Sequence, residues 1–455
     1  MRIGVDFGTT HTAAARYDGR VISFVPLDPQ NSTPQMLRSL LYIDRAHQHR
    51  LGVDAARTFL AQDTGRDVIL EDKLVGTIEN TVASQEGSEP IHIVYDVTIQ
   101  DDVGVRGRLL QSIKTGLRSR NYTGTNIFGR FYTLEELIGL ILTHVRQQAE
   151  ITLGQEVRTA TLGRPVHFSN NSTDDSYAED RLRQAAGMAG FQAVDFMPEP
   201  VAAARFYLQE ARPRERIFVF DFGGGTLDFT LIASQRGKKP YDILASHGVA
   251  VGGDDLDSAL MRGHVAPFFG TESIVDVNYD GEAIPFPVDM ARLLEQWQTI
   301  PVLSRPQHKK VIDRAIRYSE EPEQFRRLHA LVTQNYGFAL FERIEQAKRA
   351  LSSADVARIS LDAGALRLST SLHRRQFNRL IQDELATARL GVRRTLSLAG
   401  VSPDSVDVAV MTGGSSAIPL FQQMVAAELP AARLVQSDAF GSVTAGLALD
   451  AYERS

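Results

Sequence analysis

The sequence has no cysteine among its 455 residues. Disulfide bonds, thiolate catalysis, iron–sulfur clusters and the common cysteine-based zinc sites are therefore excluded. It also lacks any run of the roughly 18 apolar residues that a membrane-spanning helix needs. Asp6 stands where a signal peptide would carry its apolar segment. We therefore expect a cytoplasmic protein that does not enter membranes.

Basic residues are also fewer than acidic ones. The chain has 49 Lys and Arg against 55 Asp and Glu, a net charge of −6. Because nucleic-acid-binding proteins usually carry a basic surplus, we expect no nucleic-acid partner. The hydrophobic fraction of 43% and the charged fraction of 23% are typical of a soluble globular protein. A chain of this length is too long for one compact core, so it is expected to form several folding units.

A short pattern of aspartate, phenylalanine and glycine occurs twice in the chain. It reads VDFGTT at residues 5–10 and FDFGGGT at residues 220–226. In both copies an apolar strand precedes the turn and a second strand follows it. Glycines in such a turn allow backbone N–H groups to approach phosphate oxygens. The chain has no Walker loop, and neither turn leads from a strand into a helix as a Rossmann turn does, so the pattern predicts two phosphate-binding hairpins.

The segments around the two turns indicate a duplicated organisation, in which a cleft between two halves brings the turns face to face. Each half has a core of mixed strands and helices and carries an insertion. The expected boundaries are lobe I at 1–212 (core 1–27 and 131–212, inserted subdomain about 28–130), lobe II at 213–455 (core 213–252 and 371–437, inserted subdomain about 253–370), and a C-terminal helix at 438–455 that packs back on lobe I.

Some local elements are clear from the sequence. The Asp18-Gly19 pair predicts a hairpin turn. Residues 133–150 have the apolar spacing of a helix, and Thr133 and Glu136 form a capping-box pattern at its start. Residues 374–400 read as one long helix. The insertion after residue 28 is expected to contain short strands, including IHIVYDVTI at residues 91–99.

Asp6 and Asp221 stand at the ends of the two apolar strands. A carboxylate at such a position is partly desolvated, which is unfavourable without a cation or hydrogen-bond donors. Opposed across a cleft, the two groups would hold hydrated Mg²⁺ between carboxylates and substrate phosphates. The alternative is two unrelated turn-capping aspartates, which the match between the two turns disfavours. A protein kinase is excluded, because the chain has no H-R-D loop and no V-A-I-K strand.

Longer stretches resemble one superfamily. VDFGTT, FDFGGGTLDFTL and VMTGGSSAIP resemble the phosphate-one, phosphate-two and adenosine motifs of the actin, sugar-kinase and heat-shock-chaperone ATPases. Together with HGVAVGGDDLDSALM and IEQAKRALSS, they are most similar to the nucleotide-binding domain of the heat-shock protein 70 (DnaK) family. GRPVHF, MPEPVAA and residues 265–345 are more similar to its YegD-like branch. The resemblance implies an α/β actin-like ATPase (ribonuclease H-like) fold, with two pseudo-symmetric lobes, an inserted subdomain in each, and the nucleotide between them.

The resemblance also implies roles for individual residues. Glu199 would position the attacking water, and Lys114 would stabilise charge on the γ-phosphate, with Lys73 as the competing candidate. The expected catalytic residues are Asp6, Lys114, Glu199, Asp221 and Thr226, and the expected ligands of Mg²⁺, with an accompanying K⁺, are Asp6, Asp221 and Asp228. The expected ATP or ADP contacts are Gly8, Thr9, Thr10, Gly223, Gly224, Gly225, Thr226, Gly252, Gly253, Glu345, Lys348, Arg349, Ser352, Gly413, Gly414, Ser415 and Ile418.

The base-binding part departs from the family pattern. Glu345, Lys348, Arg349 and Ser352 share one face of a predicted helix, which by itself indicates only a solvated surface. Within the motif, Glu345 would bind ribose hydroxyls and Arg349 would stack on the purine. The family places an arginine where this chain has Ala417. Loss of that stacking partner predicts nucleotide binding weaker by roughly 0.5–2 kcal/mol.

The function implied by the resemblance is a slowly hydrolysing, chaperone-like ATPase switch that binds Mg-ATP. Because the sequence stops after the final helix, we expect no peptide-binding domain of its own. Its expected partners are ATP, unfolded polypeptide and a co-chaperone or exchange factor. Three alternatives stay open at this point: a filament-forming ATPase similar to actin, MreB or ParM, a small-molecule kinase of the sugar-kinase type, and a degenerate nucleotide-binding scaffold.

Overall fold

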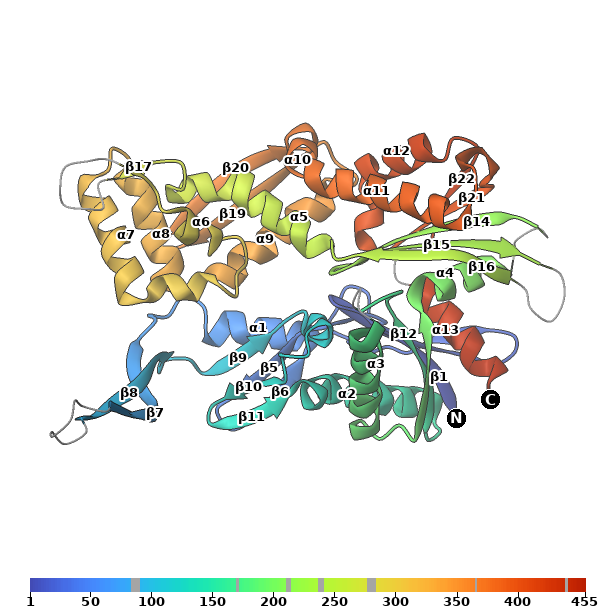
Figure 1. Cartoon of the computed structure of the whole chain (residues 1–455), viewed down its shortest axis with the longest axis horizontal. Coiled ribbons are helices and arrows are strands. Elements are labelled where there is room, and N and C mark those ends of the chain that lie inside the picture. The colour runs from blue at the N-terminus through green and yellow to red at the C-terminus, as the bar shows by residue number, and fades with distance from the viewer. Residues whose placement is uncertain are drawn as a thin grey trace.

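A computed structural model of the chain describes residues 1–82, 91–168, 172–209, 214–235, 241–275, 284–364, 366–437 and 441–455. Two bodies lie one above the other, each built around a mixed sheet (Figure 1). We call the body around the first sheet, within residues 1–198, lobe I. The body around the second sheet, within residues 214–437, is lobe II.

The sheet of lobe I has the order β13-β12-β1-β2-β3, and β4 also pairs with β2. Strand β1 pairs in parallel with β12 and antiparallel with β2. The hairpin between β2 and β3 turns at Gly19, which has a φ of 95°, as the Asp18-Gly19 signal predicts. The strands are β1 (Arg2–Phe7), β2 (His11–Tyr17), β3 (Ile22–Phe24), β4 (Leu37–Arg38), β12 (Thr159–Arg164) and β13 (Ala193–Pro198).

Two helices, α2 (Leu134–Leu153) and α3 (Ser172–Met188), bury their apolar faces against β1 and its neighbours. Helix α2 begins with the predicted capping box, in which Thr133 Oγ1 accepts from the Glu136 amide at 3.1 Å and Glu136 accepts from the Thr133 amide at 2.8 Å. Each bond satisfies an amide that has no partner inside the helix. The sequence prediction for this helix start is confirmed.

The sheet of lobe II repeats the local arrangement of lobe I. Its order is β16-β15-β14-β21-β22, and β14 pairs antiparallel with β15 and in parallel with β21. Strand β14 therefore holds the place that β1 holds in lobe I. The strands are β14 (Arg216–Phe222), β15 (Leu227–Ser234), β16 (Tyr241–Val249), β21 (Val408–Thr412) and β22 (Arg433–Gln436).

Two helices lie between the sheets, α4 (Glu199–Tyr207) and α13 (Gly441–Glu453) (Figure 1). They form a hydrophobic cluster with both lobes, in which Val201 and Leu447 pack with Val219 and Val410 of lobe II. Helix α13 also packs along β1, β2 and β12. The last described helix of the chain thus returns to the first strand.

Each lobe carries additional elements beside its sheet. Lobe I has β5 (Leu41–Asp44), β6 (His49–Leu51), α1 (Gly52–Gln62), β9 (Gly107–Leu110), the 3₁₀ helix η1 (Ile113–Arg118), β10 (Gly124–Ile127) and β11 (Arg130–Thr133). Lobe II has α5 (Gly253–Leu260), η2 (Met261–Val265), η3 (Ala266–Phe269), β17 (Ile274–Val275), β18 (Ile284–Pro285), α6 (Val288–Arg292), η4 (Ile300–Ser304), α7 (Pro306–Tyr318), α8 (Pro322–Thr333), α9 (Gly337–Ala350), β19 (Val356–Ala363), β20 (Leu366–His373), η5 (Pro403–Ser405), η6 (Gly414–Ala417) and α12 (Pro419–Glu428).

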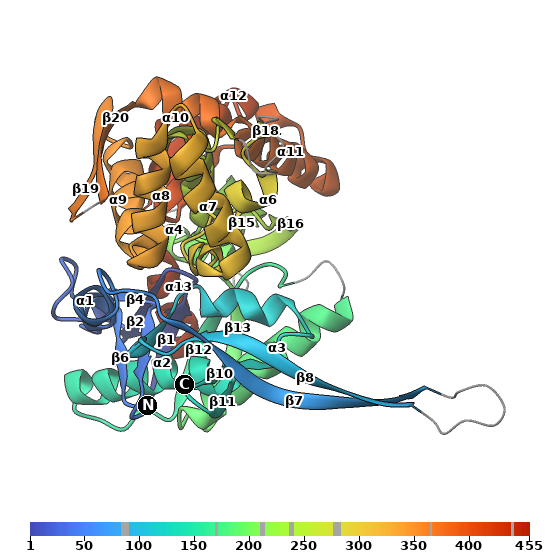
Figure 2. The same ribbon diagram turned by 90° about the vertical axis from the view of Figure 1, so that its left-hand side faces the viewer.

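One hairpin of lobe I extends away from the body of the molecule (Figure 2). It consists of β7 (Leu70–Val82) and β8 (Ile91–Asp102), which pair antiparallel with each other. The sequence predicts only short strands in this region, so the length of these two, 13 and 12 residues, differs from the prediction.

The predicted single helix over residues 374–400 is wrong. The chain forms α10 (Arg374–Leu380) and α11 (Gln382–Ala399), separated at Ile381, whose φ is −103° and ψ is 25°. Ile381 is fully buried in the lobe II core. Helix α10 packs on β20, whereas α11 packs on β15 and β16. The break allows each helix to meet its own sheet, and this tertiary packing overrides the continuous helical pattern.

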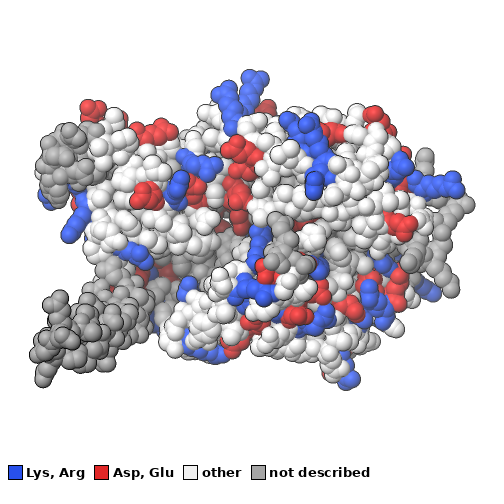
Figure 3. Space-filling view, viewed as in Figure 1, with Lys and Arg blue, Asp and Glu red and all other residues white. Residues whose placement is uncertain are grey.

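Within the described ranges, none of the helices has the length and apolar character to cross a lipid bilayer. Basic and acidic side chains are both spread over the face shown in Figure 3. The two lobes are separated on this face by a hollow.

Candidate functional site

A cavity of about 790 Å³ lies between the two lobes. Its wall includes the turn after β1, the turn after β14, the 3₁₀ helix η1 and helix α9. Because the two sheets place β1 and β14 equivalently, both Asp-Phe-Gly turns open into the same space. The two copies of the repeated sequence pattern therefore lie close together in space.

The two turns are in van der Waals contact across the cavity floor. A side-chain carbon added to Gly224 would lie 2.4 Å from Thr10 Cγ2, and one added to Gly225 would lie 3.0 Å from Thr9 Oγ1. The close approach of the two loops thus requires glycine at residue 224. The threonine hydroxyls of one lobe lie directly against the backbone of the other.

The start of helix α5 supports the second turn from behind. The amides of Gly253 and Asp254 donate to the carbonyl oxygens of Gly223 and Gly224, at 3.0 and 2.9 Å. A side-chain carbon on Gly252 would lie 2.2 Å from the Gly224 oxygen, so only glycine fits there. These bonds hold the second turn in place. The groups of the turn that are not bonded to α5 can then face the cavity.

Asp6 and Asp221 are the carboxylates that the two Asp-Phe-Gly turns contribute to the cavity wall. Burial, followed by the nearby Glu199 carboxylate, raises the pKa of Asp6 to about 7. Burial raises the pKa of Asp221 well above its usual range, and Glu199, Asp228 and Asp6 add to the rise. Like charges gathered in a low-dielectric site disfavour ionisation. A cation placed among these groups would relieve that repulsion.

Asp228 lies behind this wall. It pairs with Asp221 in the β14–β15 register and is only 2% exposed. Its Oδ1 accepts a hydrogen bond from the Val166 amide at 3.2 Å. Burial and Glu199 raise its pKa to about 7. Asp228 is therefore close to the acid pair without facing the cavity.

Lys114 and Glu199 form an ion pair in the cavity wall. Lys114 extends from η1, and Glu199 begins α4. The Lys114 ammonium donates to Glu199 Oε1 at 2.5 Å, and the lysine is 7% exposed. The competing lysine, Lys73, belongs to β7, and its side chain lies outside the described residues. A buried cation next to the acid pair can stabilise negative charge on a ligand.

The part of the chain that the structure describes contains no group of three or more His, Asp or Glu side chains arranged to bind a metal directly. Two carboxylates on the cavity wall can still bind an ion through its coordinated waters, as is usual for Mg²⁺. The chemistry of Asp6 and Asp221 fits this second mode.

The far end of the cavity is formed by α9 and the loop after β21. The Lys348 ammonium donates to the Gly253 carbonyl at 2.7 Å and to Asp257 Oδ2 at 2.6 Å. Arg349 pairs with Glu345, and its side chain is 57% exposed. Ala417 is also on the wall. The predicted polar stripe of α9 thus faces the cavity.

The cavity wall includes nearly all of the residues predicted from the sequence: Asp6, Gly8, Thr9, Thr10, Lys114, Glu199, Asp221, Gly223, Gly224, Gly225, Thr226, Gly253, Glu345, Lys348, Arg349, Ser352, Gly413, Gly414, Ser415 and Ile418. Two predicted residues, Asp228 and Gly252, pack behind it.

Sequence reasoning missed several wall residues, of which Arg118 is the most notable. Its Nη2 donates to the Gly225 carbonyl at 2.7 Å, from lobe I to lobe II. Asp228, Asp255 and Asp254 surround it, while burial lowers its pKa. The sequence signal that could have identified Arg118 as a wall residue is its spacing, four residues after Lys114. Other missed wall residues include Ser112, Thr115, Asp254, Asp255, Asp257, Trp297, Phe338 and Phe341.

Comparison with protein families gives a match to the family described as Hsp70 protein. The family model matches residues 2–286 and 331–451, which is most of the chain. The matched ranges contain both Asp-Phe-Gly turns, η1, α9 and the loop after β21. Residues 287–330 lie outside the match.

Proposed function

The chain belongs to the Hsp70 family, and we propose that it binds Mg-ATP between its lobes and hydrolyses it slowly, as a chaperone-like switch. At the level of the family, the function is that of a chaperone-type ATPase, and the fold is the actin-like ATPase fold. The proposal adds that the nucleotide is ATP, that its hydrolysis is slow, and which residues act on the nucleotide.

The single observation that carries the proposal is the meeting of both turns in one cavity with Lys114 and Glu199. Phosphoryl transfer depends almost entirely on positioning and on electrostatic stabilisation of the phosphates. Two glycine-rich turns supply backbone N–H groups, and Thr9, Thr10 and Thr226 add hydroxyl donors. Such donors suit a polyphosphate better than an uncharged ligand.

We assign Lys114 to the γ-phosphate and Glu199 to the attacking water. The pair is already formed at 2.5 Å, so the two groups hold each other in position. A phosphate would compete for the Lys114 ammonium and thereby release the Glu199 carboxylate to accept a hydrogen bond from water. A base must lie within hydrogen-bond reach of the proton that it abstracts, directly or through one water.

Magnesium is the proposed metal, with Asp6 and Asp221 as the residues that would hold it through its waters and Asp228 behind them. The donor set fits, because burial and mutual repulsion raise the pKa of these carboxyl groups. When bound, the ion would neutralise charge shared by the phosphates and the acids. A K⁺ ion near Asp228 is proposed on the family resemblance alone.

The adenosine is assigned to the end of the cavity formed by α9, where Glu345 would bind the ribose and Arg349 would cover the base. Arg349 is more than half exposed, so its guanidinium has room to move over a ring. Ala417, which is also on the wall, offers no cation for stacking. We therefore propose nucleotide binding weaker than with an arginine at that position. Gly413, Gly414, Ser415 and Ile418 would support the adenosine.

Three further points are part of the proposal. The chain is assigned to the YegD-like branch of the family and to the cytoplasm. Its partners would be unfolded polypeptide and a co-chaperone or exchange factor. The moving units would be residues 1–212 and 213–455, with the final helix packed on lobe I.

Calorimetric titration of the purified chain with ATP, with and without Mg²⁺, tests the proposed site. We expect binding that strengthens when Mg²⁺ is present and weakens in Asp6→Asn, because the ion bridges acids and phosphates. Lys310→Ala is the matched control, since Lys310 is exposed and lies outside the cavity wall. No detectable binding of ATP at millimolar concentration would overturn the proposal.

A further inference from the structure

The segment that the family model leaves unmatched, residues 287–330, reaches the cavity. It contains α6, η4, α7 and most of α8. Its Gln296, Trp297 and Gln298 lie on the cavity wall. A part of lobe II that is peculiar to this chain relative to the family model therefore borders the proposed nucleotide site.

Trp297 contacts lobe I through both its indole nitrogen and its ring. Its Nε1 donates to Gln111 Oε1 at 2.7 Å. Its ring lies 6.0 Å from that of Phe59 on α1 and 5.1 Å from that of Phe338 on α9, measured between centroids. Phe59 and Phe338 are themselves 5.5 Å apart and nearly perpendicular. We call Trp297, Gln111, Phe59 and Phe338 the aromatic clasp.

Gln111 belongs to the stretch that presents Lys114. The next residue, Ser112, has a φ of 55° and donates through Oγ to Asp254 Oδ2 of lobe II at 2.8 Å. Arg118 at the other end of η1 bonds Gly225 of lobe II. Lobe II thus holds residues 111–118 at three points, of which Trp297 provides one.

A second contact joins the two lobes through residues that lie outside the cavity wall. The amides of Gly65 and Val68 donate to the carbonyls of Gln334 and Thr333, both at 2.8 Å. Asn335 Nδ2 donates to the Asp63 carbonyl at 2.7 Å. Residues 63–68 of lobe I are therefore bonded through their backbone to the end of α8.

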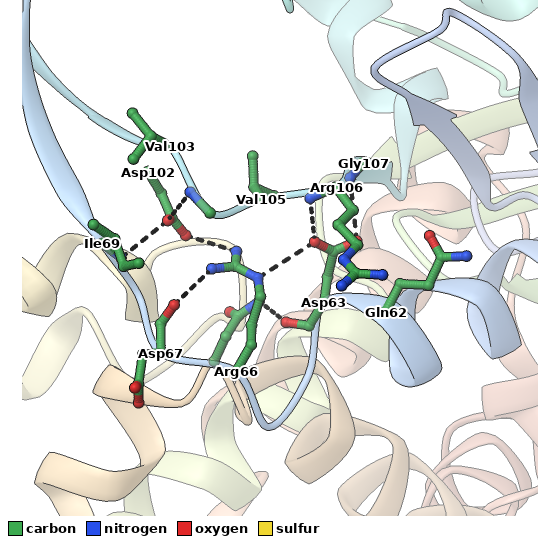
Figure 4. Close-up of polar contacts among 12 residues, drawn as sticks. Gln62, Asp63, Arg66, Asp67, Ile69, Asp102, Val103, Val105, Arg106 and Gly107 are labelled. Atoms are coloured by element: carbon green, nitrogen blue, oxygen red, sulfur yellow. Dashed lines mark hydrogen bonds and ion pairs between the residues drawn. The ribbon is translucent and has the colours of Figure 1, made fainter.

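Lobe I keeps this loop rigid with a buried acid and an ion pair (Figure 4). Asp63 is fully buried and accepts from the amides of Arg106 and Gly107, at 2.7 and 3.2 Å. Arg66 pairs with Asp102 at 2.6 Å, and Asp102 accepts from the amides at the base of the β7–β8 hairpin. The loop is thus bonded to the body of lobe I as well as to lobe II.

We propose that Trp297 is a positioning residue that clasps the two lobes over the nucleotide and thereby holds residues 111–118, with Lys114, against the phosphates. This inference rests on the proposed function. Parting the lobes requires the Trp297–Gln111 bond to break and the Phe59 ring of lobe I to separate from the Trp297 and Phe338 rings of lobe II. The clasp therefore limits nucleotide release, and it also favours the closed arrangement in which Lys114 is in place.

The test compares the dissociation of a fluorescent ADP analogue from the full chain and from variants. Trp297→Phe keeps a ring but removes the donor, and Gln111→Ala removes the acceptor from the other lobe. Each should speed dissociation about fivefold, the usual worth of one hydrogen bond. Trp297→Ala should speed it about tenfold or more, because the ring contacts are lost as well. Tyr318→Ala, an exposed aromatic in the same segment, is the matched control and should have no effect.

A double-mutant cycle separates the clasp from general destabilisation. Because Trp297 and Gln111 act through one bond, the double variant should dissociate about fivefold faster, not about 25-fold faster. The kcat for ATP should fall in Trp297→Phe, because the closed arrangement that keeps Lys114 in place is weakened. Circular dichroism should show the same fold as in the unmutated chain.

Trp297 is the sole tryptophan of the chain, so its fluorescence reports the clasp directly. Addition of Mg-ATP should reduce quenching of its emission by acrylamide. Nucleotide binding with unchanged dissociation in Trp297→Phe and Gln111→Ala would overturn this inference and leave the proposed function standing. Absence of nucleotide binding in the unmutated chain would overturn both.

Discussion

The Lys114 ammonium lies 2.5 Å from Oε1 of Glu199, and both side chains belong to the cavity wall. One comes from η1 and the other from the first turn of α4, at positions 85 residues apart in the sequence. Both side chains are nearly buried, so removal of either one would leave the other as an unpaired buried charge, which is destabilising. A negatively charged ligand bound at the two Asp-Phe-Gly turns would therefore contact the Lys114 ammonium, with the Glu199 carboxylate beside it.

Replacement of Lys114 by alanine should lower kcat for ATP by about 10²-fold or more, since it removes a preorganised cation from the phosphates. The loss should appear in single-turnover hydrolysis, which isolates chemistry from product release. Lys309→Ala, at an exposed position away from the cavity, should leave the rate unchanged. A Lys114→Ala protein that hydrolyses ATP normally would show that Lys114 is only a structural partner of Glu199.

Arg118 joins the lobes through its bond to the Gly225 carbonyl. Arg118→Ala should lower kcat/KM about tenfold or more, because hydrogen bonds of charged groups are worth more than neutral ones. Arg118→Lys should recover only part of this loss, since an ammonium cannot reproduce the guanidinium geometry. Steady-state kinetics of the three proteins measure the effect. Equal activity of all three would remove Arg118 from the site.

Ala417→Arg should strengthen ATP binding by roughly 0.5–2 kcal/mol, the usual range for a cation on an aromatic face. The new guanidinium would stack on the base in addition to Arg349, the side chain assigned to the base in the proposed site. Calorimetric titration measures the gain, and an Ala417→Leu variant separates added charge from added bulk. Unchanged or weaker binding in Ala417→Arg would place the base elsewhere.

The acid cluster gives a pH dependence of stability in the nucleotide-free protein. The pKa of Asp6 and that of Asp228 are each raised to about 7, and that of Asp221 is raised well above its usual range, mainly by burial. The unfolded chain loses these protons near pH 4, so the folded protein retains protons that unfolding releases. The free energy of unfolding should therefore fall as pH rises from about 5 to about 7.

Thermal melts between pH 5 and pH 8, without nucleotide or Mg²⁺, measure this dependence. Asp221→Asn should flatten the curve, because it removes one buried acid and part of the repulsion on the others. Asp362→Asn, at an exposed position on β19, serves as the control. A Tm that rises over this interval would contradict the assignment of the acids as a self-repelling cluster.

Local features of the site followed from the sequence because each depends on a few neighbouring residues. The Asp-Phe-Gly turns predict hairpins, and their repetition predicts that Asp6 and Asp221 share one space. The register of β14 and β15 then places Asp228 directly opposite Asp221 on the neighbouring strand, which strand alternation alone does not reveal.

Contacts between distant parts of the chain were not predictable in the same way. Trp297 and Gln111 are 186 residues apart, and nothing near either residue indicates the other. The break at Ile381 has a similar origin, because the helical pattern runs through it and only packing on two different sheets separates α10 from α11. Such features depend on tertiary contacts between the lobes and between the helices and sheets within each lobe.

The central claim is that the cavity between the lobes hydrolyses ATP with the help of its paired acids. Single-turnover hydrolysis of ATP with Mg²⁺, by the unmutated chain and by Asp221→Ala, tests it most directly. The account predicts slow but measurable turnover in the first protein and none above background in the second, with folding verified by circular dichroism. Equal rates in the two proteins, or no hydrolysis by the unmutated chain, would contradict it.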